Sequence, residues 1–149
     1  VYNWSEVLNA DPDTIYGISF SKNKLDSIPY EIIRYKQLKH LNLEKNNLTK
    51  IPDFMSKFEE LNVLILDKNK LTSFPNQILS LSKLTELQLS RNEIDSIPDG
   101  IDQLIHLERL DLWSCPITYF SNSLYLLKEL KTFDIRGCKS DTRGEGVQK

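Results

Sequence analysis

One 23-residue pattern recurs along this chain without losing phase, and it constrains the fold more than any other feature. Six successive copies are opened by Ile15, Leu38, Leu61, Leu84, Leu107 and Leu130. A fixed period in this range is typical of a solenoid, in which each copy forms one turn and buries its apolar side against its neighbours. The sequence therefore predicts one elongated domain of stacked turns, which suits partner binding better than a closed catalytic pocket.

Within each copy the apolar residues occupy fixed positions, counted from the opening Leu or Ile. Positions 1, 4, 6, 11, 14, 18 and 21 are apolar in all five complete copies. Positions 4 and 6 are separated by one residue, which predicts a short strand with one buried side. Proline at position 15 in four copies ends the extended segment, and the spacing from 18 to 21 predicts a short helical or 3₁₀ turn. The bulkier helical side would place the parallel strands on the inner, concave face.

Position 9 predicts a ladder of polar side chains inside the stack. Its members are Asn23, Asn46, Asn69, Asn92, Cys115 and Cys138. An Asn side chain both donates and accepts hydrogen bonds, so a buried row can satisfy the backbone where each turn leaves its strand. The two cysteines stand one period apart and should point the same way, which disfavours a disulfide and predicts buried free thiols.

The segment L-K-H-L-N-L-E-K-N-N-L, residues 38–48, resembles the strand pattern L-x-x-L-x-L-x-x-N-x-L of the leucine-rich repeat family. The I-P-x-x-[IM] remainder and the period are similar to the short repeat class. The resemblance covers residues 15–138 and implies an α/β, horseshoe-like solenoid. Residues 1–15 look like the leader helix of secreted or surface spirochaetal members. The same class includes intracellular scaffolds that contact small GTPases.

The ends of the chain differ from the copies between them. Residues 1–14 predict a capping helix with Trp4, Val7 and Leu8 on one face and a capping box from Asn3 to Glu6. The domain would then comprise five full copies at 15–37, 38–60, 61–83, 84–106 and 107–129, a partial sixth copy at 130–139, and a mobile tail at 140–149. No second cap is evident, so the last strand is a candidate edge for homodimerisation.

Composition and motifs exclude several classes of function. The net charge of −2 provides no general attraction to nucleic acid, and no apolar run approaches the roughly 18 residues expected of a spanning helix. His40 and His106 lie far apart in the pattern, and the chain has no catalytic motif, phosphate loop or zinc-ligand spacing. We therefore expect no enzyme activity, cofactor or metal.

The outward strand positions 3, 5 and 7 vary between copies, and they predict a binding face. The candidate partner-binding residues are His40, Asn42, Glu44, Val63, Ile65, Asp67, Glu86, Gln88, Arg109, Asp111 and Trp113. Val63 and Ile65 would form an apolar centre with a charged rim, as interfaces often have, and Trp is enriched among energetic anchors. Alternatively, Val63 and Ile65 simply favour a strand, and Trp113 covers an open end. The cations at position 8 are interpreted as a solvated rim: Lys22, Lys45, Lys68 and Arg91.

The sequence thus favours a non-enzymatic module that binds a protein partner. The bacterial resemblance implies a secreted or cell-surface location and a host-cell protein as the partner. Two alternatives stay open: a cytoplasmic scaffold for a small GTPase, and a structural protein that self-associates through its C-terminal edge.

Overall fold

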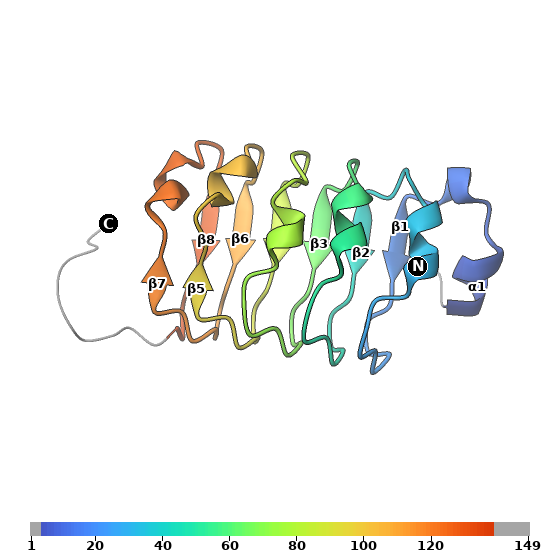
Figure 1. Cartoon of the computed structure of the whole chain (residues 1–149), viewed down its shortest axis with the longest axis horizontal. Helices are drawn as coiled ribbons and strands as arrows, with labels where there is room; N and C mark the ends of the chain where they lie inside the picture. The colour runs from blue at the N-terminus through green and yellow to red at the C-terminus, as the bar shows by residue number, and fades with distance from the viewer. Residues whose placement is uncertain (1–3, 139–149) are drawn as a thin grey trace.

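The computed structural model describes residues 4–138, apart from the side chain of Trp4, and shows one continuous stack of turns (Figure 1). A short helix, α1 (Trp4–Asn9), precedes the stack. One six-stranded parallel sheet runs along it in the order β1-β2-β3-β4-β6-β8. Its strands are β1 (Gly17–Ser19), β2 (His40–Asn42), β3 (Val63–Ile65), β4 (Glu86–Gln88), β6 (Arg109–Asp111) and β8 (Thr132–Asp134).

The register between neighbouring strands equals the sequence period. Leu41 pairs with Leu64, and Leu64 pairs with Leu87, so equivalent residues of successive turns stand side by side. The central leucine or isoleucine of β1, β2, β3, β4 and β6 is buried, while the residues on either side of it face outward. This arrangement confirms the in-register parallel strands that the sequence predicts.

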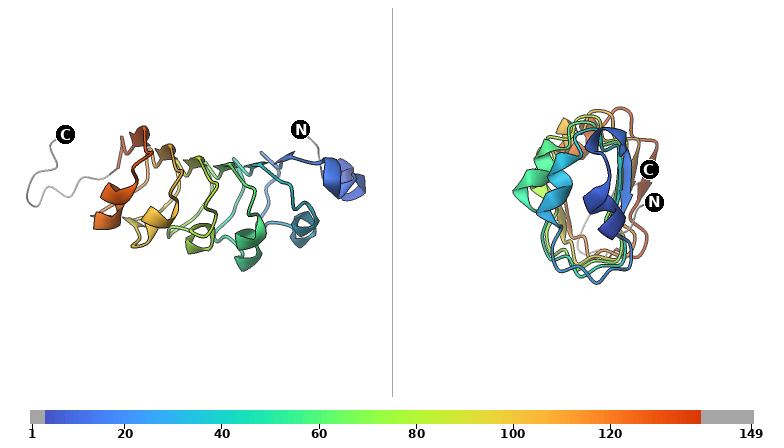
Figure 2. Two further views of the ribbon diagram at one scale, coloured as in Figure 1. Left: turned by 90° about the horizontal axis from the view of Figure 1, so that it is seen from above. Right: turned by 90° about the vertical axis from the view of Figure 1, so that its right-hand side faces the viewer.

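Short 3₁₀ segments form the other long side of the stack (Figure 2). They are η2 (Tyr30–Arg34), η3 (Asp53–Lys57), η4 (Asn76–Ile78), η5 (Ile101–Gln103) and η6 (Asn122–Leu126). Pro29, Pro52 and Pro75 immediately precede the first three of these segments, where a missing N–H costs nothing and the fixed φ suits the turn. The predicted sequence of strand, bend, short helix and return is therefore correct.

A second, two-stranded sheet was not expected from the sequence. β5 (Ser96–Ile97) pairs in parallel with β7 (Tyr119–Phe120), again at a separation of 23 residues. β5 lies just before η5, and β7 lies just before η6. There, two neighbouring turns are extended enough to share backbone hydrogen bonds.

The core is a single apolar column between the two sides of the stack. All but three of the 35 predicted core positions in the five complete copies are buried. The exceptions lie in the first and last of those copies: Leu25 and Leu124 are half-buried, and Phe120 is 39% exposed. In the sixth copy, Leu130 and Phe133 are also half-buried and Ile135 is 38% exposed. Side chains near the ends have fewer neighbouring turns to cover them.

The N-terminal segment lies against the first turn, as a cap should. Val7 is only 1% exposed, and its carbonyl oxygen accepts a hydrogen bond from the hydroxyl of Tyr35. Leu8, however, is 37% exposed, so its predicted place on the buried face is wrong. The helix ends at Asn9, and the Asp11 side chain then caps the 3₁₀ turn η1 (Pro12–Thr14).

Some predictions concern residues that the structure leaves undescribed. The proposed capping contact of Asn3, the side chain of Trp4 and the predicted mobile tail at 140–149 all lie outside the described residues. None of the helices within residues 4–138 is both long and apolar enough to cross a membrane.

Candidate protein-binding surface

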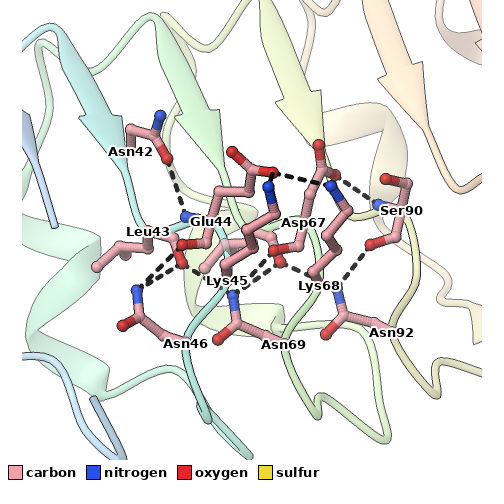
Figure 3. A network of polar contacts seen from close by, with 11 residues as sticks. Asn42, Leu43, Glu44, Lys45, Asn46, Asp67, Lys68, Asn69, Ser90 and Asn92 are labelled. Carbon is pink, nitrogen blue, oxygen red and sulfur yellow. Dashed lines mark hydrogen bonds and ion pairs between the residues drawn. The ribbon is translucent and has the colours of Figure 1, made fainter. Parts of the chain in front are cut away.

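A ladder of asparagine side chains holds the end of each strand in place (Figure 3). Asn69 illustrates it: Nδ2 donates at 3.0 Å to the carbonyl oxygens of Leu43 and Leu66, and Oδ1 accepts at 3.0 Å from the Leu48 N–H. The same set of bonds is made by Asn46 and Asn92. Because each amide bonds to two successive turns, the ladder fixes the spacing of the strands that carry the outward side chains.

The first member of the ladder departs from the prediction. Asn23 is exposed, and its Nδ2 bonds only to the Ser21 carbonyl, at 3.0 Å. It belongs to the first turn of the stack, so no earlier strand supplies the second carbonyl that Asn69 receives from Leu43. The predicted buried role of Asn23 is therefore wrong.

Both cysteines are free and direct their sulfurs at the preceding turn. The Sγ atoms of Cys115 and Cys138 lie 3.2 and 3.3 Å from the carbonyl oxygens of Leu89 and Leu112. Cys115 is buried, and this burial raises the pKa of its thiol to about 11. Cys138 is only half-buried, so the prediction of a buried thiol fails there.

Position 8 of each copy has a left-handed backbone. The residues are Lys22, Lys45, Lys68, Arg91 and Ser114, with φ between 54° and 62°, and Gly137 with φ of 74°. This conformation turns the chain out of the strand and lets the N–H of Lys45 donate to the Asp67 carbonyl of the next turn at 2.9 Å. A side chain at such a φ costs about 1–2 kcal/mol relative to a right-handed backbone.

Three of these cations are engaged with neighbours on the same surface. Lys45 and Lys68 both reach Glu44, at 3.4 and 3.0 Å, and the hydrogen bond from Lys68 lowers the pKa of that carboxyl. The guanidinium of Arg91 lies 4.3 Å from the ring centroid of Trp113, a cation–π contact. Two of the four cations of this row therefore neutralise Glu44, and a third supports Trp113.

We call the outward side of the six-stranded sheet the strand face. It consists of the first and third residue of each strand and the residue two positions further on. All eleven predicted binding residues lie on it, along β2, β3, β4, β6 and the bends that follow them. His40 and Arg109 are exposed, and the other nine are half-buried. Ser90, which also occupies an outward position, is only 6% exposed.

The apolar part of the strand face lies on β3. Val63 and Ile65 are half-buried and border an open hollow of about 300 Å³. Its outward lining is Gly17, Ser19, His40, Asn42, Val63 and Ile65. The hollow therefore spans the first three strands, with aliphatic groups on one side and small or polar groups on the other.

Ile65 interrupts a structural rule of this surface. At its position, four turns carry a side-chain oxygen that accepts a hydrogen bond from the N–H two residues later. The pairs are Ser19 with Ser21, Asn42 with Glu44, Asp111 with Trp113, and Asp134 with Arg136. An isoleucine has no oxygen with which to do this. The bend after β3 therefore lacks this side-chain hydrogen bond, as does the bend after β4, where Gln88 bonds to Glu86 instead. Of the two exceptions, Ile65 is the one that places an aliphatic side chain on the outward surface.

Asp67 carries the least compensated negative charge next to this apolar pair. Its Oδ1 accepts a 2.7 Å hydrogen bond from the Ser90 N–H. Burial raises the pKa of the Asp67 carboxyl, and the nearby carboxylates of Asp111 and Glu44 raise it further. Within residues 4–138, no Lys or Arg comes within ion-pair distance of Asp67, whereas Glu44 has two such partners.

The described residues contain no group of three or more His, Cys, Asp or Glu side chains placed to hold a metal ion. The two histidines are separate: His40 lies on the strand face, and His106 lies 3.3 Å from Glu129 on the exposed return between turns. The surface therefore offers shape, apolar contact and charge.

A sequence profile described as a leucine-rich repeat region matches residues 21–148. The chain belongs to the leucine-rich repeat family. This match covers most of the chain, and the solenoid with its 3₁₀ turns is an α/β horseshoe of that family, as the sequence resemblance implied. A search of curated proteins gave no significant match.

Solved structures of other leucine-rich repeat proteins share the fold. The ectodomain of the Arabidopsis thaliana receptor kinase GASSHO1/SCHENGEN3 is 27% identical over 74% of this chain and 14% of its own, with a TM-score of 0.65. A Leptospira interrogans leucine-rich repeat protein is 25% identical over 83% and 37%, also with a TM-score of 0.65. An internalin of Listeria monocytogenes is 21% identical over 94% and 39%, with a TM-score of 0.77. The chain thus spans well under half the length of each, and a spirochaetal protein is among them.

Sequence reasoning about the leucine-rich repeats missed three features of the strand face. The hydrogen bond that the N–H at position 7 donates to the side chain at position 5 could have been inferred from the repeated Ser, Asn and Asp at position 5. The left-handed backbone at position 8 had one signal, Gly137. The contact of Arg91 with Trp113 had none, because it joins side chains of different turns.

Proposed function

We propose that this leucine-rich repeat protein is a non-enzymatic recognition module that binds a protein partner on its strand face. The observation that carries the proposal is the pair Val63 and Ile65, two partly exposed aliphatic side chains beside a hollow. Ile65 stands where four other turns have an oxygen that supports the backbone. A residue that gives up a local hydrogen bond and faces outward is best explained by contact with another molecule.

The solved relatives support a partner that is a protein. The plant ectodomain was crystallised in complex with CASPARIAN STRIP INTEGRITY FACTOR 2, and the Listeria protein is named an internalin. The plant receptor ectodomain supports a secreted or surface-exposed module that binds a protein over a cytoplasmic scaffold for a small GTPase. A host-cell protein as the partner is the part of the proposal that rests on the bacterial resemblance of the sequence. We assign the anchoring contacts to Val63, Ile65 and Trp113, with charged residues around them.

The test is a double substitution with a matched control. Ligands would be selected by the full chain from a displayed peptide library, and their affinities measured for Val63→Ser with Ile65→Ser and for Ile105→Ser. Ile105 is also an exposed aliphatic residue, but it lies on the return between turns. We expect the double variant to keep its melting temperature within a few degrees and to lose at least about tenfold in affinity. Loss in Ile105→Ser with retention in the double variant would contradict the proposal.

Self-association through the C-terminal edge is a second candidate function. In the described residues β8 is hydrogen-bonded on one side only, and nearby apolar side chains are exposed: Tyr119, Phe120, Leu126 and Ile135. If this edge pairs, light scattering should show a mass that doubles with concentration and returns to that of the monomer in Ile135→Lys. A monomer at millimolar concentration would refute it.

A further inference from the structure

The hollow on the strand face is open because β1 has no side chain at one position. Gly17 stands opposite His40 in the sheet, and a Cβ built on it would lie 3.7 Å from the His40 Cβ, an ordinary contact. The backbone of Gly17 does not have a positive φ, so the fold does not require glycine there. The hollow of about 300 Å³ corresponds to the volume of roughly ten water molecules, enough for one aliphatic side chain against Val63 and Ile65.

An acid outside the lining of the hollow, but close to Ile65 in the chain, favours a cation next to it. Asp67 follows Ile65 by two residues and is half-buried without a cation partner in the described part of the chain. Glu44, Glu86 and Asp134 each lie within ion-pair distance of a Lys or Arg, whereas Asp111, like Asp67, has no such partner among the described residues. A ligand cation at Asp67 would gain a charge-assisted hydrogen bond and relieve its repulsion from Asp111 and Glu44.

The same charges argue against other classes of ligand. Asp67 and Asp111 lie on this face without an ion-pair partner among the described residues, and they would repel the phosphates of a nucleic acid or of an anionic membrane. A hollow with two aliphatic side chains on one side and an unpaired carboxylate nearby is instead complementary to a peptide that places an aliphatic side chain next to a basic one.

We propose that the partner presents a segment with Leu, Ile or Val beside Lys or Arg, the aliphatic side chain filling the hollow at Gly17, Val63 and Ile65 and the cation pairing with Asp67. This inference rests on the proposed function, because it specifies the ligand of the same face. Gly17 then acts as a specificity-determining residue that keeps the hollow open.

The experiment selects ligands from a displayed library of random 12-residue peptides with the full chain. We expect the selected peptides to share an aliphatic residue adjacent to Lys or Arg. Two variants test the two halves of the site. Gly17→Val fills the hollow, and Thr132→Val, at the equivalent exposed position of β8, is its control. Asp67→Asn keeps an acceptor for the Ser90 N–H while it removes the charge, and Asp134→Asn removes a charge elsewhere on the same sheet.

Both test variants should weaken binding by about tenfold, and their controls by less than twofold. In Asp67→Asn, replacing the peptide's basic residue by Ala should cost almost nothing more, because the two changes remove one interaction. Two outcomes would overturn this inference and leave the proposed function standing. In both, the selected peptides depend on Val63 and Ile65 for binding. In the first they lack the basic residue, and in the second they bind Gly17→Val and Asp67→Asn with normal affinity. If no selected peptide depends on Val63 and Ile65, the inference and the proposed function both fail.

Discussion

Replacing Asn69 by Ala should destabilise the protein by about 3 kcal/mol, a large part of the roughly 5–15 kcal/mol available to a domain. The substitution leaves the Leu48 N–H buried without its acceptor, which costs about 1–3 kcal/mol. It also removes two bonds donated to Leu43 and Leu66, each worth about 0.5–1.5 kcal/mol. The Leu43 carbonyl keeps a second donor from Asn46, and the Leu66 carbonyl keeps one from Asn92. The total destabilisation is therefore near the lower end of the range that these contributions add up to.

Thermal unfolding followed by circular dichroism measures this directly. At about 2–4 °C per kcal/mol for a chain of this size, Asn69→Ala should melt roughly 6–12 °C below the parent protein. The control is Asn23→Ala, which removes the same side chain from the exposed end of the ladder and should shift the melting temperature by no more than about 1–2 °C. Equal shifts in the two variants would refute the reasoning, because they would show that hydrogen bonding between turns does not distinguish the two positions.

Three further predictions concern polar and thiol groups. Cys115→Asn should raise the free energy of unfolding, measured in urea, by about 1 kcal/mol. An amide oxygen accepts a hydrogen bond better than sulfur does, and it could accept one from the Ile94 N–H as Asn92 does from the Leu71 N–H. No gain in stability would contradict the proposed ladder. Iodoacetamide at pH 8 should modify Cys138 well before Cys115, because the Cys115 thiol is buried and its pKa of about 11 keeps it protonated until the protein unfolds. Mass spectrometry measures the two rates of modification. Equal rates would show that the ends of the strands open in the folded protein. Because burial raises the folded-state pKa of Asp67 above its value in the unfolded chain, its carboxylate lowers stability at neutral pH and this penalty disappears as the pH falls through the folded-state pKa. Asp67→Asn should therefore melt higher than the parent at pH 7, and the difference should shrink in acid; a constant difference would argue against the assigned cause.

Most of the fold is predictable because each copy repeats the same physical constraint. A leucine at a given position must be buried in every turn. Leu41, Leu64 and Leu87 therefore predict the same buried position in three successive turns, which defines both the strand and its register. The proline before η2, η3 and η4 similarly marks the start of each 3₁₀ segment. Repetition turns a weak local signal into a strong one.

The deviations occur where a turn lacks one of its neighbours. Asn23 has the residue type of the ladder but not the carbonyl of a preceding turn, and Phe120 has the residue type of the core but is 39% exposed. A pattern assigns residues to positions in a repeat, whereas burial depends on what is stacked above and below. Sequence alone could not separate these end effects from the pattern itself.

The strand face was predictable as a set of outward positions, but the contacts between its side chains were not. The variation at positions 3, 5 and 7 located the surface, and all eleven residues lie on it. The lack of a cation at Asp67 and the pairing of Arg91 with Trp113 depend on distances between side chains of different turns. These distances are set by the packing of the stack and have no local sequence signal.

A methyl NMR titration tests the central claim most directly. With isotope-labelled valine and isoleucine methyl groups, a selected peptide would be added to the full chain and the shift of each methyl resonance followed. We predict that the largest changes occur at Val63 and Ile65, with Ile105 on the return between turns unaffected. Saturable changes at Ile105, with Val63 and Ile65 unmoved, would contradict the assignment of the strand face as the binding surface.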